Sequence, residues 1–223
     1  AQLEILPYLQ RQGIQLEWLI LSHDDNDHSG GARAILSAYP DIQLTTASQK
    51  RYGEKNTPEN DRTFCLAGKQ WTWQGLRFTV LSPDNIVPRA ENPDSCTLLL
   101  TDGKYNILLT GDADLSVEYK ILPKLDKIHV LQVGHHGSKT STGEALVRHT
   151  QPDIALISSS RWNPWHFPHQ TVIDRLTQHH AKLYNTAEDG QIRVLFEEND
   201  IKIQTARAEF SPWYRRLIGL TGK

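Results

Sequence analysis

The sequence contains no methionine, no long apolar run and no leader in which charged residues precede apolar ones. Because methionine is missing even at position 1, the chain cannot be an open reading frame read from its start, and we expect a fragment of a longer protein. A membrane-spanning helix needs roughly 18 to 20 consecutive apolar residues, and no run here approaches that length. We therefore expect a soluble chain that inserts no segment into a lipid bilayer.

Cysteine is scarce, and the two cysteines, Cys65 and Cys96, lie far apart with neither in a CxxC spacing. This pattern argues against a metal site built from thiolates. Two reduced thiols are the simplest interpretation. A single disulfide is the alternative, and it would require an oxidising compartment.

A strong excess of one charge is also missing, because 24 basic residues face 26 acidic ones and the net charge is −2. The chain as a whole therefore lacks the positive field that attracts nucleic acid. Binding of a polyanion would have to be local. Basic residues do gather toward the end of the sequence, at Lys202, Arg207, Arg215, Arg216 and Lys223.

Apolar segments alternate with polar loops in the manner of an α/β protein, and no repeat or low-complexity linker divides the chain, so we predict one domain over residues 1–223. Four of the predicted strands run directly into polar loops. Ligands of layered α/β proteins collect beyond the carboxyl ends of strands, so these four loops are candidates for one shared site. The predicted helices cover residues 1–13, 30–38 and 115–122; the predicted strands cover 16–21, 42–47, 71–73, 76–81, 96–101, 105–110, 128–133, 154–157 and the segment 182–205 around Asp189-Gly190; residues 48–68 are predicted to be irregular.

The first of these loops, in the run LILSHDDNDHSGG, holds five side chains that can bind a metal within six residues. Placing so many polar groups at one strand end would cost several kcal/mol each without partners, and a cation can satisfy acids and imidazoles together. An EF-hand is excluded, because counting from Asp24 puts Ser29 and Ile35 where that loop needs glycine and an acid. A solvated acidic turn that caps a helix at Ser29 is the alternative without a metal.

Two further loops carry candidate residues. In GDAD, Asp112 follows a strand and could bridge two metal ions, although an aspartate there is often a helix N-cap. In GHHGSKTS, we expect the consecutive His135 and His136 to point in different directions, so that one binds metal while the other faces substrate. Ser138 and Lys139 are predicted to begin a helix and to hold a phosphate oxygen; their alternative role is capping and surface charge.

Together the motifs HDDNDHSGG, LLTGDAD and LQVGHHGSKTS resemble the metallo-β-lactamase fold, and specifically the carboxy-terminal domain of the ComEC family of DNA-uptake channel proteins. The general signature of the fold is HxHxDH, and the HxDxDH pattern with Asp25, together with GHHGS, is similar to the ComEC branch. The resemblance implies an αββα sandwich of α/β (α+β, four-layer) class. The chain begins after the place of the first strand pair of that fold, so we expect this pair to be missing.

The resemblance also implies two divalent metal ions, Mn²⁺ or Zn²⁺, and a ligand set. His23 and Asp25 would bind one ion, Asp27 and His28 the other, Asp112 would lie between them, and His135 or His136 would join the second ion. Many members of the fold supply one more histidine from the loop at residues 82–95, which has none here, so we expect weak binding of the first ion. His166 and His169 lie in a segment similar to a His-Pro element of the family. The alignment with that element is ambiguous by one residue, so it leaves open which of the two histidines approaches the site.

Two metal ions can lower the pKa of a water molecule and neutralise a phosphodiester, so hydrolysis is the natural chemistry. Asp25 or Asp27 would orient the water, and His136 would donate to the phosphoryl or leaving oxygen. From the resemblance, we expect a nuclease that degrades the DNA strand that is not imported, with single-stranded DNA and the transmembrane channel domain of the same protein as partners. The whole protein would lie in the inner membrane, with this domain on the periplasmic side.

Alternatives remain at this stage. One keeps the enzyme and changes the substrate, to a phosphorylcholine ester, a lactone or a β-lactam. Another is a domain without catalysis that docks on the channel. Trp162 and Trp165 would either stack on nucleobases or pack against the core.

Overall fold

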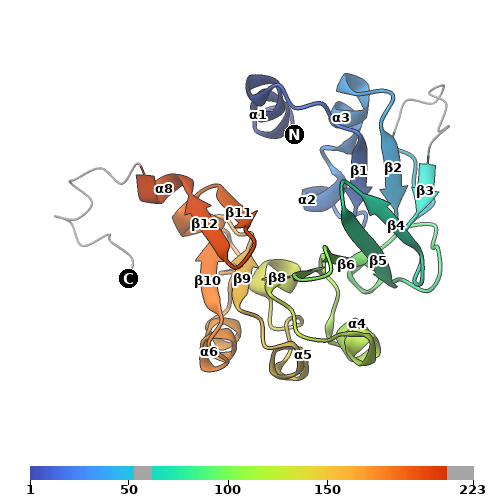
Figure 1. Ribbon diagram of the computed structural model, residues 1–223. Helices are drawn as coiled ribbons and strands as arrows, with labels where there is room; N and C mark the ends of the chain where they lie inside the picture. Colours follow the sequence, from blue (N-terminus) through green and yellow to red (C-terminus); the bar gives the residue numbers. More distant parts are fainter. Residues whose placement is uncertain (53–61, 210–223) are drawn as a thin grey trace.

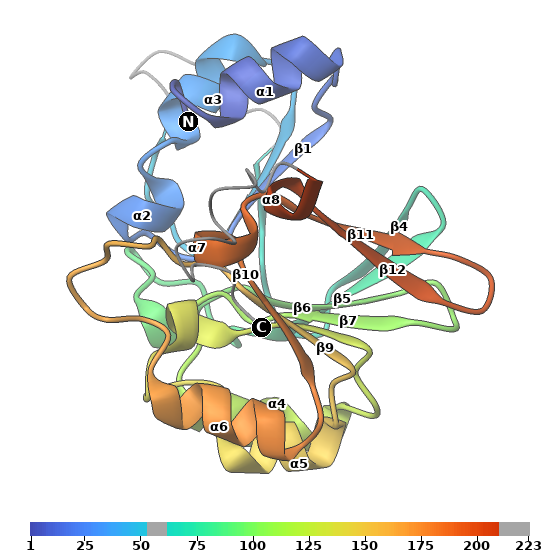
Figure 2. The same cartoon turned by 90° about the vertical axis from the view of Figure 1, so that its left-hand side faces the viewer.

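The computed structural model describes residues 1–52 and 62–209. In these residues two β-sheets lie face to face between two layers of helices, as Figures 1 and 2 show. The basic residues Arg215, Arg216 and Lys223 lie outside the described part of the chain. No helix among the described residues has the length and apolar character that crossing a membrane demands.

The smaller sheet is parallel and has the strand order β1-β2-β3 within the described residues. The chain reaches it through helix α1 and returns between its first two strands through α2 and α3, which confirms the predicted order of strand 16–21, helix 30–38 and strand 42–47. Figure 2 shows α1 and α3 on the outer side of this sheet. The elements are α1 (Ile5–Gln12), β1 (Trp18–Leu21), α2 (Asn26–Ser29), α3 (Ala32–Ala38), β2 (Gln43–Thr46) and β3 (Arg62–Phe64).

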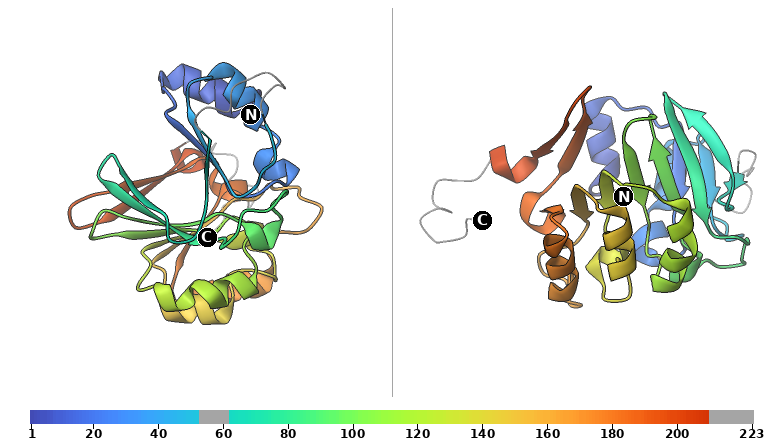
Figure 3. Two further views of the ribbon diagram at one scale, coloured as in Figure 1. Left: turned by 90° about the vertical axis from the view of Figure 1, so that its right-hand side faces the viewer. Right: turned by 60° about the horizontal axis from the view of Figure 1, so that its bottom comes forward.

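The larger sheet has the order β10-β9-β8-β7-β6-β5-β4, parallel from β10 to β7 and antiparallel from β7 to β4. The predicted strands 71–73, 76–81, 96–101 and 105–110 are confirmed in it, and they pair as the two hairpins β4-β5 and β6-β7. Helices α4, α5 and α6 cover its outer face, as Figure 3 also shows. The elements are β4 (Gln70–Trp73), β5 (Leu76–Ser82), β6 (Thr97–Thr101), β7 (Asn106–Leu109), α4 (Leu115–Ile121), β8 (Val130–Gln132), α5 (Glu144–Thr150), β9 (Ile154–Ile157), α6 (Gln170–Gln178) and β10 (Lys182–Asn185).

Alternating side chains of β6 explain the layers. Leu98 and Leu100 pack into the core between the two sheets, while Leu99 packs against the core beneath the helices, because successive side chains of a strand point to opposite faces. A third apolar cluster around Leu21 and Leu44 fills the space between the smaller sheet and its helices. Three apolar layers thus separate four layers of backbone, and the predicted αββα arrangement is confirmed.

Of three local predictions, two were wrong and one was correct. The segment 48–68 is not wholly irregular, because Arg62–Phe64 forms β3 beside β2. The prediction of strands around Asp189-Gly190 is confirmed: β10 joins the large sheet, the helix α7 (Thr186–Asp189) follows it, and the final hairpin pairs β11 (Ile192–Phe196) with β12 (Ile201–Thr205) before α8 (Ala206–Glu209). Ser138 and Lys139 do not begin a helix, because a loop follows them and α5 starts only at Glu144.

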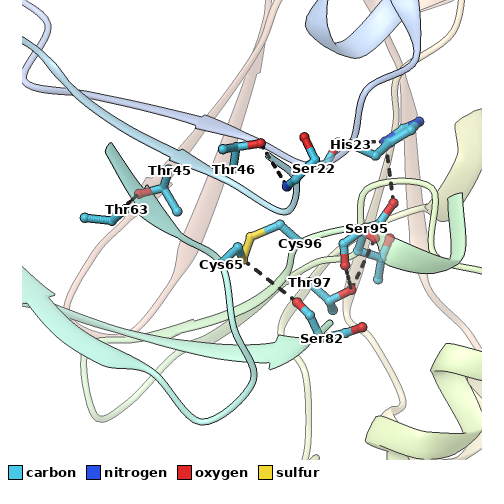
Figure 4. Close-up of a disulfide and its surroundings, with 12 residues drawn as sticks. Ser22, His23, Thr45, Thr46, Thr63, Cys65, Ser82, Ser95, Cys96 and Thr97 are labelled. Carbon is cyan, nitrogen blue, oxygen red and sulfur yellow. Dashed lines mark hydrogen bonds between the residues drawn. A yellow bond between two sulfur atoms is a disulfide. The ribbon is translucent and has the colours of Figure 1, made fainter. Parts of the chain in front are cut away.

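The two cysteines form a disulfide between Cys65, which follows β3, and Cys96, which precedes β6 (Figure 4). The simpler interpretation of two reduced thiols was therefore wrong. The bond lies in the core between the sheets and ties one sheet to the other. Cys96 also donates its backbone N–H to the carbonyl oxygen of Ser22, at 2.8 Å, which places the crosslink next to the histidine-rich loop.

Candidate metal centre

His23 is the first residue of the motif to enter the site, directly beyond β1. Its ring is fully buried, and its Nδ1 atom lies 3.1 Å from the hydroxyl oxygen of Ser22. The Nε2 atom faces the other way, 3.6 Å from Asp25 Oδ2 and 3.9 Å from Asp112 Oδ2. Burial outweighs the neighbouring carboxylates and lowers the pKa of His23, so the neutral ring, which can bind a metal, is favoured.

Asp24 points away from the histidines. Its carboxylate accepts hydrogen bonds from the backbone N–H of Ala90 at 2.7 Å, the hydroxyl of Ser48 at 3.0 Å and the hydroxyl of Tyr52. Burial and this carboxylate raise the pKa of Tyr52 to about 12. Asp24 therefore anchors the loop that carries the motif and does not join the candidate ligands.

Asp112 lies at the centre of the site, just beyond β7, and is 3% exposed. Its carboxylate oxygens lie 3.2 Å from Nε2 of His28, 3.8 Å from Nε2 of His135 and 3.9 Å from Nε2 of His136. Burial opposes the charged form, but the close contact with His28 and the positive charges of His28, His136 and His135 lower the pKa of Asp112. Burial also opposes the protonated form of His28, yet Asp112, Asp27 and Asp25 raise the pKa of that ring.

His135 and His136 both turn their Nε2 atoms toward Asp112, so the prediction that they point in different directions was wrong. Each adopts a left-handed backbone conformation, with φ of 48° and 55°, inside the single turn Gly134–Gly137. Nδ1 of His136 donates to the carbonyl oxygen of Ser158 at 2.7 Å, since a carbonyl can only accept, and this leaves the Nε2 lone pair of the neutral ring free for the site.

The candidate ligand atoms fit a metal centre by their spacing. Two ligands of one tetrahedral Zn²⁺, each about 2.0 to 2.1 Å from the ion, lie about 3.3 to 3.4 Å from one another. Nε2 of His28 lies 3.2 Å from Nε2 of His136, and Nε2 of His136 lies 3.3 Å from Asp27 Oδ2. Within residues 1–52 and 62–209, two groups of three residues have ligand atoms that all lie within 4.8 Å of one another: His23, His28 and Asp112, and Asp27, His28 and His136.

Unsatisfied buried atoms support the same conclusion. Among the described residues, Nε2 of His23 and Oδ1 of Asp112 are buried without a hydrogen-bond partner. Leaving such atoms unpaired costs about 1 to 3 kcal/mol each, and a bound cation would satisfy both. The residues present therefore fit divalent metal ions. His28 belongs to both groups of ligand atoms, whereas Asp25 lies beside the first group, 3.6 Å from His23 Nε2 and 3.4 Å from the guanidinium of Arg89.

A cleft of about 860 Å³ opens beside these groups, where the loops after β1, β7, β8 and β9 meet, as predicted. Trp165 and Phe167 form one wall. The ring of Phe167 stacks on that of His136, with centroids 6.5 Å apart, and the ring of Trp165 stacks on Phe167 at 6.4 Å. The lining residues are Asp25, Asn26, Asp27, Asp112, His135, His136, Ser158, Ser159, Ser160, Asn163, Trp165 and Phe167.

Some predicted residues fall outside this lining. Ser138 is buried, and its hydroxyl lies 3.0 Å from that of Thr140, which in turn contacts Nδ1 of His135 at 3.2 Å. Lys139 is exposed and does not line the cleft. His166 and His169 do not line it either, although they flank Phe167 in the same loop.

Sequence reasoning missed Phe167 and the serines that follow β9. The available signal was their position after the fourth apolar strand.

Trp162 and Trp165 do not pack against the core, because their side chains are 90% and 66% exposed.

Comparison with known proteins identifies relatives of this chain. Residues 1–161 match the family model described as the metallo-beta-lactamase superfamily. The chain is 58% identical over 221 residues to "Recombination protein 2" of Haemophilus influenzae and 32% identical over 209 residues to "ComE operon protein 3" of Bacillus subtilis. These matches cover 99% and 86% of this chain but 27% and 26% of the relatives, so the chain spans about a quarter of their length.

A solved structure shares the fold at low sequence identity. Igni18, described as a novel metallo hydrolase from the archaeon Ignicoccus hospitalis, superposes with a TM-score of 0.51 at 12% identity. The match covers 86% of this chain and 81% of that one.

Proposed function

This chain belongs to the metallo-beta-lactamase superfamily, and from that premise we propose that it is a metal-dependent phosphodiesterase that cleaves single-stranded DNA. Superfamily membership supports metal-dependent hydrolysis. The observation that carries the proposal is the convergence of His23, His28, His135 and His136 on the buried carboxylate of Asp112 at the wall of an open cleft.

In this proposal six residues would hold two divalent ions: His23, Asp25, Asp27, His28, Asp112 and His136. His28 belongs to both groups of ligand atoms. Bound ions supply Lewis-acid chemistry and neutralise phosphate charge. Metal identity is not fixed by the donor set, although Asp25 in place of an imidazole makes the set harder and favours Mn²⁺ relative to an all-histidine site.

The residues themselves direct the hydrolysis. The carboxylate of Asp25 or Asp27 orients the attacking water and takes its proton, because both carboxylates line the cleft. The water oxygen bonds to phosphorus while the bond to the leaving oxygen breaks. His135, whose Nε2 atom faces the cleft side of Asp112 outside the two ligand groups, donates a hydrogen bond to the leaving or phosphoryl oxygen.

The aromatic wall supports a nucleic-acid substrate. Unpaired bases stack on exposed aromatic rings, each worth about 1 to 3 kcal/mol, and Trp165 presents such a ring 6.4 Å from Phe167 at the cleft. The names of the relatives, which include a recombination protein and a competence protein, support a role in DNA uptake. The disulfide supports an oxidising compartment, and hence the periplasmic side of the inner membrane, next to a channel domain of the same protein.

The test is cleavage of a labelled single-stranded oligonucleotide by this chain after loading with Mn²⁺ or Zn²⁺, beside a panel containing a phosphorylcholine ester, a lactone and a β-lactam. We expect cleavage of the oligonucleotide that is lost in Asp112→Ala. Asp114→Ala is the matched control, because Asp114 belongs to the same GDAD turn but caps α4 through Ser116 and Val117. Turnover of another panel member without DNA cleavage would overturn the proposed substrate. Absence of bound metal would overturn the proposal that this chain is an enzyme.

A further inference from the structure

One side chain contacts both histidines of the first motif on the side away from the candidate metals. The hydroxyl oxygen of Ser22 lies 3.1 Å from Nδ1 of His23 and 3.1 Å from Nδ1 of His28. We propose that Ser22 is a positioning residue that fixes the tautomer and orientation of both rings, so that both Nε2 lone pairs point into the metal centre. This inference rests on the proposed metal site but concerns the rings before any metal binds.

The hydrogen-bonding capacity of a hydroxyl group limits how Ser22 can serve two rings. A serine oxygen has one hydrogen to donate and two lone pairs that can accept. A histidine that offers its Nε2 lone pair must carry its proton on Nδ1. Both rings can meet this condition at once if each Nδ1–H donates to one lone pair of Ser22. The same oxygen can donate to only one ring, and that ring would then carry its proton on Nε2.

The backbone holds Ser22 in this place. Its carbonyl oxygen accepts the N–H of Cys96 at 2.8 Å, as part of the strand end seen in Figure 4. On its other side lies Gly111, whose φ is +56°, and a Cβ atom built there would be 2.8 Å from Cβ of Ser22. The absence of a side chain at Gly111 therefore allows Ser22 to sit between the two motifs.

Ser95 gives a contrast within the same region (Figure 4). Its hydroxyl lies 3.5 Å from Nδ1 of His23 and accepts the N–H of Asp112 at 3.2 Å, so it contacts one of the two rings. His136 differs again, because a backbone carbonyl holds its Nδ1. Ser22 thus contacts two rings that both approach Asp112, and removing its side chain takes a hydrogen-bond partner from each of them.

The first measurement needs no variant. Long-range ¹H–¹⁵N NMR of the metal-free protein, at a pH where both rings are neutral, distinguishes a proton on Nδ1 from one on Nε2. We expect His23 and His28 to be protonated on Nδ1 in the wild type and to become tautomer mixtures in Ser22→Ala. Protonation on Nε2 of both rings in the wild type would overturn the proposal.

The second measurement is metal affinity, by competition with a chromophoric chelator for Zn²⁺ and Mn²⁺. Loss of an outer partner of a ligating histidine typically lowers affinity about 10- to 100-fold, and we expect this in Ser22→Ala for both ions bound. Ser95→Ala should weaken binding of one ion only. Ser141→Ala is the matched control, because this buried hydroxyl donates to the carbonyl of Ala113 and should leave affinity unchanged.

The two hypotheses fail separately. If the wild type binds no divalent ion, the proposed function fails, while the NMR result still decides the role of Ser22. If the wild type binds two ions and Ser22→Ala binds them equally well with unchanged tautomers, the role of Ser22 is disproved and the metal centre stands.

Discussion

The Nε2 atoms of His28 and His136 lie 3.2 Å apart, although the two residues are 108 positions apart in the sequence. His28 lies in the short helix α2 that follows β1 of the smaller sheet, and His136 lies in the turn Gly134–Gly137 that follows β8 of the larger sheet. Two neutral imidazole lone pairs that face each other at this distance repel one another, and a cation between them removes that repulsion. The pair therefore joins the two halves of the sandwich only when that partner is supplied.

Metal binding should accordingly stabilise the fold. At a free metal concentration of about 100 times the dissociation constant, the free energy of unfolding should rise by about 2.7 kcal/mol. We expect thermal unfolding to show this increase in the wild type and a chelator to reverse it. In Asp112→Asn the increase should vanish, because the central carboxylate loses its charge. Asp114→Asn should keep both the stability and the metal effect, because an asparagine oxygen caps a helix about as well as an aspartate does. A metal effect of wild-type size in Asp112→Asn would contradict the assignment.

Trp165 should control the affinity for single-stranded DNA. Loss of one stacked base costs about 1 to 3 kcal/mol, so Trp165→Ala should raise the KM for an oligonucleotide about 5- to 150-fold. A small diester without bases, such as bis(p-nitrophenyl) phosphate, should show little change in KM. Trp162→Ala is the control, because that ring is 90% exposed and does not line the cleft. Equal losses on both substrates would show that Trp165 supports the loop and not the base.

The disulfide should supply a large share of the stability. Cys65 and Cys96 are 31 positions apart, and closing a loop of that length is worth about 3 to 4 kcal/mol in the chain-entropy model. We expect urea unfolding of the paired substitutions Cys65→Ala and Cys96→Ala to show a loss of this size. Wild type unfolded in the presence of a reductant should give the same midpoint as the double variant. A midpoint that reductant leaves unchanged would mean that the crosslink is absent in solution.

The sequence predicts those parts of the site that depend on strand ends. Apolar runs locate β1, β7, β8 and β9, and the residues after them meet at one cleft because β7, β8 and β9 are parallel neighbours. The common direction of His135 and His136 could not be predicted, because flanking glycines permit many conformations and packing selects the left-handed one. β3 has no local signal either; three residues become a strand only through pairing with Leu44 and its neighbours in β2.

Glu118 of α4 should make stability depend on pH. Its carboxylate is 3% exposed and accepts the N–H groups of Thr142 and Gly143 at the end of the histidine loop. Burial outweighs these bonds and the charge of Arg175, and raises the pKa of Glu118 from 4.5 to about 7. Between those two values the folded state keeps a proton that the unfolded state has released, so stability falls as pH rises through this interval.

The size of this effect follows from the shift, at about 1.4 kcal/mol for each pKa unit, and should reach about 3 kcal/mol at pH above 7. Glu118→Gln removes the ionisable group, so the free energy of unfolding of this variant should not show the decline between pH 4.5 and 7 that Glu118 causes. The amide accepts only one of the two N–H bonds well, so the variant should be less stable at every pH. Urea unfolding of metal-free protein at several pH values from about 4.5 to 8 measures the difference between the two curves. Parallel curves would show that Glu118 ionises normally in the fold, and that its hydrogen bonds and the charge of Arg175 balance its burial.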